Sequence, residues 1–209
     1  VLGTGWAYWL FASYAEVYSL AIFVIVTALY LALKADRLRD TRYLYGLAIC
    51  CGMSVAHHRA IALALPAPLL IALPALWETF RRQKSFLFKW IGLAVGVGAG
   101  AYLYLLIRSL MHASWMWGDP STPTGFWSLM SGATYLRIID WPKTLAGWLD
   151  MIGQVGQAWI DLMLWPMALL GVSGLLVMLI RRKIRYAFAL LFVGAVCFMF
   201  AITVQGSFP

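Results

Sequence analysis

The sequence contains no asparagine, only eight acidic residues and only three cysteines in 209 positions. Without asparagine, there is no acceptor for N-linked glycosylation. Cys50, Cys51 and Cys197 lie in apolar runs and lack the paired spacing of a zinc site, so we interpret them as small buried apolar residues. With 63% hydrophobic and 11% charged residues, the composition excludes an ordinary soluble domain.

Most of the sequence consists of long apolar runs. They are continuous rather than alternating, and several approach the roughly 20 residues that a helix needs to cross a bilayer. Because backbone groups in lipid must be hydrogen-bonded internally, and the pattern is not that of a barrel, we predict an all-α polytopic transmembrane helix bundle that forms one domain over residues 1–209. About six spans are expected, at 17–33, 43–57, 60–77, 88–107, 162–180 and 186–204.

The beginning of the chain suggests that more protein precedes it. Val1 lies inside an apolar stretch, and residues 1–13 have the composition of the end of another spanning or re-entrant helix. We therefore expect the chain to be a fragment, and the lack of a recognisable signal peptide then carries no information.

The net charge of +8 comes from three basic clusters in short connections between apolar runs. This distribution is typical of cytoplasmic connections under the positive-inside rule, so the other ends of the spans are expected at the outer or lumenal face. No folded basic domain is present that would bind nucleic acid. The clusters are Lys34, Arg37, Arg39 and Arg42; Arg81, Arg82, Lys84 and Lys89; and Arg181, Arg182, Lys183 and Arg185.

One long outer loop, residues 108–161, separates two of the expected spans. It holds four of the eight acidic residues and six of the eleven tryptophans. Near its end, Trp148 and Ile152 recur at helical spacing opposite Asp150 and Gln154. This pattern predicts an amphipathic helix, either along the membrane surface or as a solvated cap on the bundle.

Polar residues at the outer ends of the early spans are candidate site residues. Glu16 lies at the outer mouth of a span, where a carboxylate is costly unless it is paired or hydrated; the alternative is a favourable charge at a helix N-terminus. His57, His58 and Arg59 form the tip of a helical hairpin. Adjacent histidines point about 100° apart on a helix, which suits a phosphate or another substrate better than a metal, and the alternative is a polar turn.

The loop offers three further candidates. Arg108 either clamps a phosphate or extends to the membrane interface. Trp117 either stacks on a sugar ring or belongs to an interfacial aromatic belt, and Asp119 is either a turn former before Pro120 or a site carboxylate. We expect no metal and assign no catalytic residue. Close helix packing, rather than a nucleotide loop, is predicted for Gly92, Gly96, Gly98 and Gly100.

Several short motifs occur in an order found in a known family. They are Ala15-Glu16-Val17-Tyr18; Gly52-Met-Ser-Val-Ala-His57-His58; Tyr102-Leu-Tyr104-Leu-Leu-Ile-Arg108 leading to Trp117-Gly118-Asp119-Pro120; and Gly125-Phe126-Trp127 with a segment ending at Tyr135. Over about residues 5–140, the chain resembles a multi-spanning bacterial family of unknown function. That family is similar to the eukaryotic transmembrane protein O-mannosyltransferase and to GT-C glycosyltransferases.

The resemblance implies transfer of a sugar, mannose or another hexose, from a polyprenyl-phosphate donor to a protein or glycan acceptor at the outer face, without a cofactor. It implies inversion and a carboxylate base in the first outer loop, which we expect upstream of Val1. His57 and Arg59 depart from the family pattern around His58. The residues that match the motifs, with roles in the site or its scaffold, are Glu16, His58, Arg108, Trp117 and Asp119.

Two other classes fit the residues. A transporter or flippase for a lipid or small solute is compatible with the proline-containing hairpin, and a non-catalytic membrane scaffold needs no site at all. In every case we expect an integral multi-pass protein in contact with membrane lipid, with a bacterial inner membrane favoured over the endoplasmic reticulum.

Overall fold

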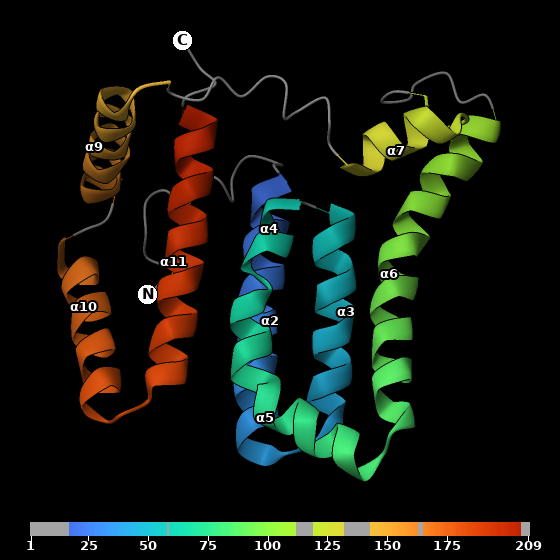
Figure 1. The fold of residues 1–209 in the computed structure, drawn as a ribbon, viewed down its shortest axis with the longest axis horizontal. Helices are drawn as coiled ribbons and strands as arrows, with labels where there is room; N and C mark the ends of the chain where they lie inside the picture. Colours follow the sequence, from blue (N-terminus) through green and yellow to red (C-terminus); the bar gives the residue numbers. More distant parts are fainter. Residues whose placement is uncertain (1–16, 58, 112–118, 132–142, 163–164, 206–209) are drawn as a thin grey trace.

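A computed structural model describes residues 17–57, 59–111, 119–131, 143–162 and 165–205, and all regular structure in these ranges is helical (Figure 1). The predicted all-α class is therefore confirmed. The helices are α2 (Val17–Leu38), α3 (Thr41–His57), α4 (Arg59–Ala64), α5 (Pro66–Arg82), α6 (Ser85–Leu110), α7 (Pro123–Ser131), α9 (Leu145–Leu162), α10 (Trp165–Ile180) and α11 (Ile184–Gln205).

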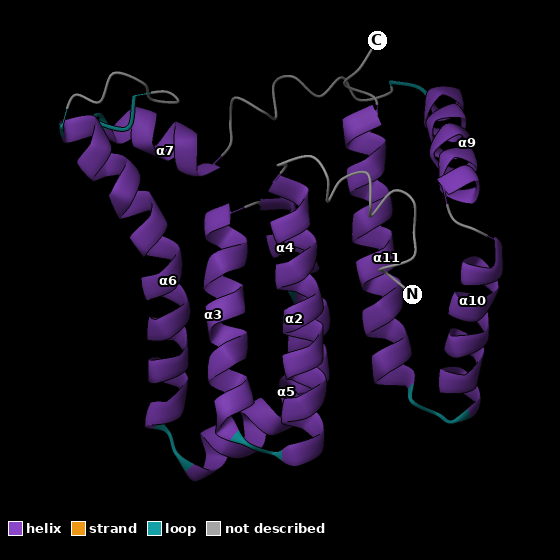
Figure 2. Cartoon of the chain, turned by 180° about the vertical axis from the view of Figure 1, so that it is seen from behind, coloured by secondary structure: helices purple, strands orange, loops and turns teal. Residues whose placement is uncertain are grey.

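The long helices stand side by side in a row. The row runs from α6 through α3, the α2–α5 pair and α11 to α10, and each member packs against the next. Figure 2 shows the same order from behind. Helix α7 lies beyond the end of α6, and α9 packs against α11. The long helices run up and down, so the bundle has two ends, one at the top and one at the bottom of the helices in Figure 1.

Small side chains pack the centre of the row. Ala28, Ala32 and Ala35 form an alanine stripe on α2 and are fully buried, and they belong to the same apolar cluster as Leu44 and Leu47 of α3. In a membrane, no hydrophobic driving force brings helices together, so small residues that let backbones approach supply much of the packing. The alanine stripe thus explains why α2 can lie between α3 and α5.

Glycine allows the closest approach, between α3 and α6. A Cβ added at Gly52 would lie 2.4 Å from the carbonyl oxygen of Ala94, and one at Gly98 would lie 3.4 Å from the carbonyl oxygen of Gly52. The predicted packing role is confirmed for Gly98. An added Cβ would meet nothing within 4 Å at the other three positions, so they do not pack on the described part of the chain: Gly92, Gly96 and Gly100.

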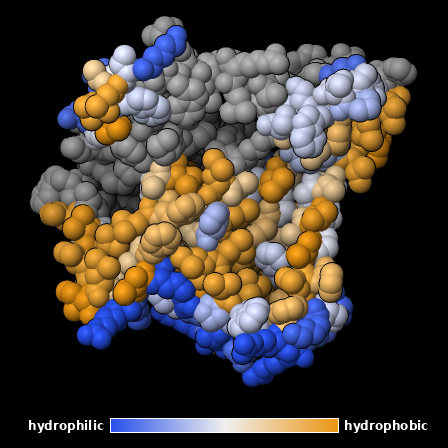
Figure 3. Space-filling view, viewed as in Figure 1, coloured by the Kyte–Doolittle hydropathy of each residue, from blue (hydrophilic) through white to orange (hydrophobic). Residues whose placement is uncertain are grey.

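The three basic clusters lie at the same end of the bundle, at the bottom of the helices in Figure 1, and this end is here called the basic end. The α2–α3, α5–α6 and α10–α11 connections are all at the bottom of Figure 1. Figure 3 shows hydrophilic surface at this end and apolar surface above it. The opposite end is called the outer end. The three clusters therefore lie at the same end of the helices, as expected, and their assignment to the cytoplasmic side stays a prediction.

Two of the basic turns are closed by arginines in the left-handed backbone conformation. Arg39 has φ 55° and Arg182 has φ 53°. The Arg39 N–H donates to the carbonyl of Ala35 at 3.0 Å, and the Lys183 N–H donates to the carbonyl of Met178 at 2.8 Å. Glycine is the usual residue at such caps because it has no Cβ. Both turns therefore keep a positive charge where the backbone favours glycine.

Helices α2 and α6 supply the clearest membrane character. Within the described ranges, Ser19–Leu38 and Ser85–Leu110 are long and apolar enough to cross a bilayer, and Leu169–Ile180 and Ile184–Cys197 are shorter apolar helices. On α6, Phe88 is 78% exposed, as lipid-facing side chains would be. These features indicate a membrane location. The expected number of about six spans stays a prediction.

Three elements differ from or refine the expected boundaries. The predicted span 60–77 is divided, because α4 ends at Ala64 and α5 begins at Pro66, and α5 continues to Arg82. Proline lacks an N–H and is accepted at the start of a helix. The amphipathic helix expected near the end of the long loop is α9, in which Gln154 donates to the Asp150 carboxylate at 3.0 Å. Helix α7 was not predicted.

Cysteine labelling tests the assignment of the two ends to two sides of the membrane. In a protein whose three native cysteines are replaced, Asp119→Cys should react with a membrane-impermeant maleimide added outside, because the positive-inside rule predicts that the end opposite the basic clusters faces that side. Arg82→Cys, at the basic end, should react only after the membrane is permeabilised. The reverse pattern would invert the topology, and equal reactivity of both positions in sealed membranes would contradict a transmembrane arrangement.

Candidate functional site

Two candidate residues lie at the outer ends of the neighbouring helices α3 and α6. Helix α3 ends at His57, which is half-buried, and α6 carries the exposed Arg108 in its last turn. The Tyr102 hydroxyl donates to the carbonyl of Val55 at 3.2 Å. This hydrogen bond holds α6 against the last turn of α3, so His57 and Arg108 both lie at the outer end of the bundle (Figure 1).

Helix α7 brings Asp119 to this end. The rings of Tyr102 and Phe126 pack edge to face with centroids 6.3 Å apart, which places α7 against α6. Asp119 accepts hydrogen bonds from the Ser121 hydroxyl and from the Ser121 N–H, the latter at 3.0 Å. These two bonds, the hydroxyl first, hold the pKa of the exposed Asp119 carboxyl below its usual value.

The hydrogen bonds also define what Asp119 does locally. A carboxylate that accepts the N–H two residues ahead forms an Asx turn. Thr122 then accepts the N–H of Gly125 at 3.1 Å at the start of α7. The structure therefore shows the turn-forming role that was one of the two expectations for Asp119, with the carboxylate ionised.

The remaining predicted site residues cannot be placed with these three. Glu16, His58 and Trp117 lie outside the described residues. Arg59 begins α4, and its side chain is likewise outside what is described. The described ranges contain no group of three His, Cys, Asp or Glu residues that could hold a metal ion.

Two of the residues at the outer end, Arg108 and His57, are of types that can bind an anion. Arg108 is a permanent cation with forked N–H donors, and within the described residues it forms no ion pair. His57 adds an imidazole at the end of α3. A phosphate can be held by such donors without a metal.

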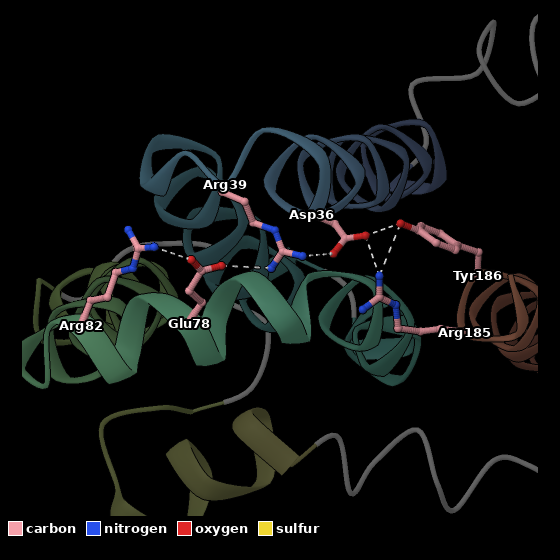
Figure 4. Close-up of polar contacts among 6 residues, drawn as sticks. All are labelled: Asp36, Arg39, Glu78, Arg82, Arg185 and Tyr186. Atoms are coloured by element: carbon pink, nitrogen blue, oxygen red, sulfur yellow. Dashed lines mark hydrogen bonds and ion pairs between the residues drawn. The ribbon is translucent and has the colours of Figure 1, made fainter.

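A second polar centre lies at the basic end and was not predicted. It joins residues from α2, α5 and α11 with the turn after α2, as drawn in Figure 4. Arg185 donates to the Asp36 carboxylate at 2.5 Å, and the Tyr186 hydroxyl donates to the same oxygen. Arg39 lies 3.5 Å from the other Asp36 oxygen and 3.5 Å from Glu78, which also pairs with Arg82 at 2.7 Å.

Burial distinguishes Asp36 from Glu78, the other acidic residue of this centre. Its side chain is 6% exposed, against 41% for Glu78. A carboxylate in an apolar bundle is retained only with charged partners and hydrogen bonds. Asp36 therefore fastens α11 to α2 across 149 positions of sequence. The signal in the sequence was the aspartate itself, a carboxylate in an apolar helix two residues before that helix ends.

The comparisons with known proteins bear on the first third of the chain. No curated protein and no solved structure matches the chain. A family model does match, over residues 4–81, and it is described as Protein O-mannosyl-transferase TMEM260 N-terminal domain. The match includes Glu16 and the His57–Arg59 tip and excludes Arg108, Trp117 and Asp119. Residues 4–81 are thus similar to a protein O-mannosyltransferase N-terminal domain, which confirms that part of the expected resemblance.

Proposed function

We propose that the chain is part of a membrane glycosyltransferase. In this proposal a sugar, mannose or another hexose, passes from a polyprenyl-phosphate donor to a protein or glycan acceptor at the outer end. The observation that carries the proposal is the match of residues 4–81 to an O-mannosyltransferase N-terminal domain. That match suggests a glycosyltransferase-like role.

The charge arrangement supports the choice of a phosphate-bearing donor. Arg108 and His57 lie at the outer end of the bundle, opposite the basic turns. No described carboxylate pairs with Arg108. In the proposed reaction an acceptor hydroxyl attacks the anomeric carbon, the bond from that carbon to the phosphate oxygen breaks, and the polyprenyl phosphate leaves with the electron pair. Arg108 and His57 would stabilise the charge on the departing phosphate. The hydroxyl proton would pass to a carboxylate base, for which no residue of this chain is assigned.

Replacing Arg108 tests this role. In the full-length protein, Arg108→Ala is expected to lower turnover of a radiolabelled polyprenyl-phosphate hexose by about 100-fold, as removal of one preorganised donor does elsewhere. The measurement is protein-dependent transfer of label from lipid to acceptor in membranes. Arg181→Ala, an exposed cation at the opposite end, is the matched control and should keep full activity.

The outcomes separate the proposal from its rivals. Full activity of Arg108→Ala, with the variant still folded in detergent, would remove Arg108 from the site. Absence of transfer in the unmodified protein would contradict the glycosyltransferase proposal itself.

A transporter or flippase is the second candidate, and one structural observation favours it. The helical pass that follows His57 is broken at Leu65, between α4 and α5, and α5 contains Pro74 in its interior. Broken helices near the centre of a bundle line substrate sites in transporters. Movement of intact labelled lipid across the bilayer, without transfer of its sugar, would support this candidate over the transferase.

A further inference from the structure

The α5–α6 turn carries cations that the acidic residues at the basic end do not neutralise. Asp36 and Glu78 are already engaged by arginines from α5, α11 and the turn after α2. Within the described residues, no ion pair involves Arg81, Lys84 or Lys89, and all three side chains are exposed. The turn therefore presents a net positive surface.

Aromatic rings accompany these cations. The Arg81 guanidinium lies over the Trp77 ring at 5.0 Å from its centroid, and the Lys84 ammonium lies over the Phe80 ring at 4.5 Å. Trp77 is 52% exposed, and Phe88, one turn into α6, is 78% exposed. Exposed rings beside cations are characteristic of the boundary between lipid headgroups and acyl chains.

The path of α5 places these residues together. Pro74 lies inside α5, where it removes a backbone hydrogen bond and permits a bend. Figure 1 shows the last part of α5 turning away from α2 toward the start of α6. The end of α5 and the start of α6, which carry these cations and rings, therefore adjoin each other at the basic end.

We propose that the α5–α6 turn binds an anionic phospholipid, with Arg81, Lys84 and Lys89 on the headgroup phosphate and Trp77 and Phe88 against the upper acyl chains. The charge selects an anionic headgroup. The exposed rings select a lipid over a free anion, because the lipid covers apolar surface as well as the charges. This site is independent of the proposed glycosyl transfer and lies at the other end of the molecule.

Native mass spectrometry of the full-length protein in detergent tests the site. The probes are phosphatidylglycerol and phosphatidylcholine with identical acyl chains. The unmodified protein should retain phosphatidylglycerol preferentially, and Arg81→Gln/Lys84→Gln should weaken its retention by about thirtyfold, as expected for two cations near an anionic surface. Arg181→Gln/Lys183→Gln removes the same two residue types from the α10–α11 turn, and this control should leave retention unchanged.

Each other outcome overturns the proposal. Equal weakening by both double variants would mean that diffuse surface charge attracts the lipid, and unchanged retention in Arg81→Gln/Lys84→Gln would exclude the turn. Displacement of phosphatidylglycerol by millimolar inorganic phosphate would indicate a free-anion site. Should the double variant fail to fold, Lys84→Gln alone is expected to weaken retention by about fivefold, and no change would contradict the site.

Discussion

Replacing Asp36 with alanine is expected to lower the free energy of unfolding by about 3–5 kcal/mol, which is the usual cost of removing one partner from a buried ion pair. The Asp36 side chain is 6% exposed and lies 2.5 Å from Arg185. Its loss would leave Arg185, at 30% exposure, without a carboxylate partner and would release the hydroxyl of Tyr186. The attachment of α11 to α2 would weaken with it.

Denaturant unfolding in detergent, followed by circular dichroism, measures this effect. Glu78→Ala is the matched control, because it removes a carboxylate from the same cluster that is 41% exposed. Exposed ion pairs contribute about 0–1 kcal/mol, so Glu78→Ala should change stability little. Similar losses in the two variants would show that burial of Asp36 is not what makes its ion pair strong.

Replacing Gly52 with alanine is expected to cost about 3 kcal/mol, at the upper end of the usual range for overpacking. The new Cβ would lie 2.4 Å from the Ala94 carbonyl oxygen and 2.7 Å from the Cβ of Val97. A backbone oxygen cannot move aside alone, so α6 would have to shift away from α3. The hydrogen bond from Tyr102 to Val55, nearer the outer end of the same pair, would be strained as well.

Gly96, a glycine on α6, provides the control for helix propensity. Alanine favours a helix over glycine by about 0.5–1 kcal/mol. An added Cβ at Gly96 meets nothing within 4 Å, so Gly96→Ala should be neutral or slightly stabilising. Thermal unfolding of both variants would compare them, and a stabilised Gly52→Ala would show that α3 and α6 do not approach as closely as described.

Much of the helical framework could be predicted because apolar runs and basic connections are local signals. The helices from α2 to α6, and α9 to α11, lie close to the expected ranges. Helix α7 escaped prediction because Pro123–Ser131 is short and has no buried stripe. The division of the span at Leu65 was missed because Pro66 can either begin a helix or kink one, and only the packed structure decides between these outcomes.

The site residues were less predictable, because their roles depend on tertiary contacts. The clustering of His57 and Arg108 at one end followed from the alternation of spans, but the Tyr102 hydrogen bond that joins their helices spans 47 positions. No role was predicted for Asp36. Its burial depends on α11, whose position relative to α2 no local pattern determines.

The left-handed arginines have a consequence for the order in which the protein assembles. The turns at Arg39 and Arg182 are closed by backbone hydrogen bonds to carbonyls four or five residues upstream. The α2–α3 and α10–α11 hairpins can therefore each close as soon as the ribosome has delivered them. Asp36 and Arg185 can meet only after the start of α11 has emerged. Synthesis would thus produce preformed hairpins first and the ion pair that locks them together last.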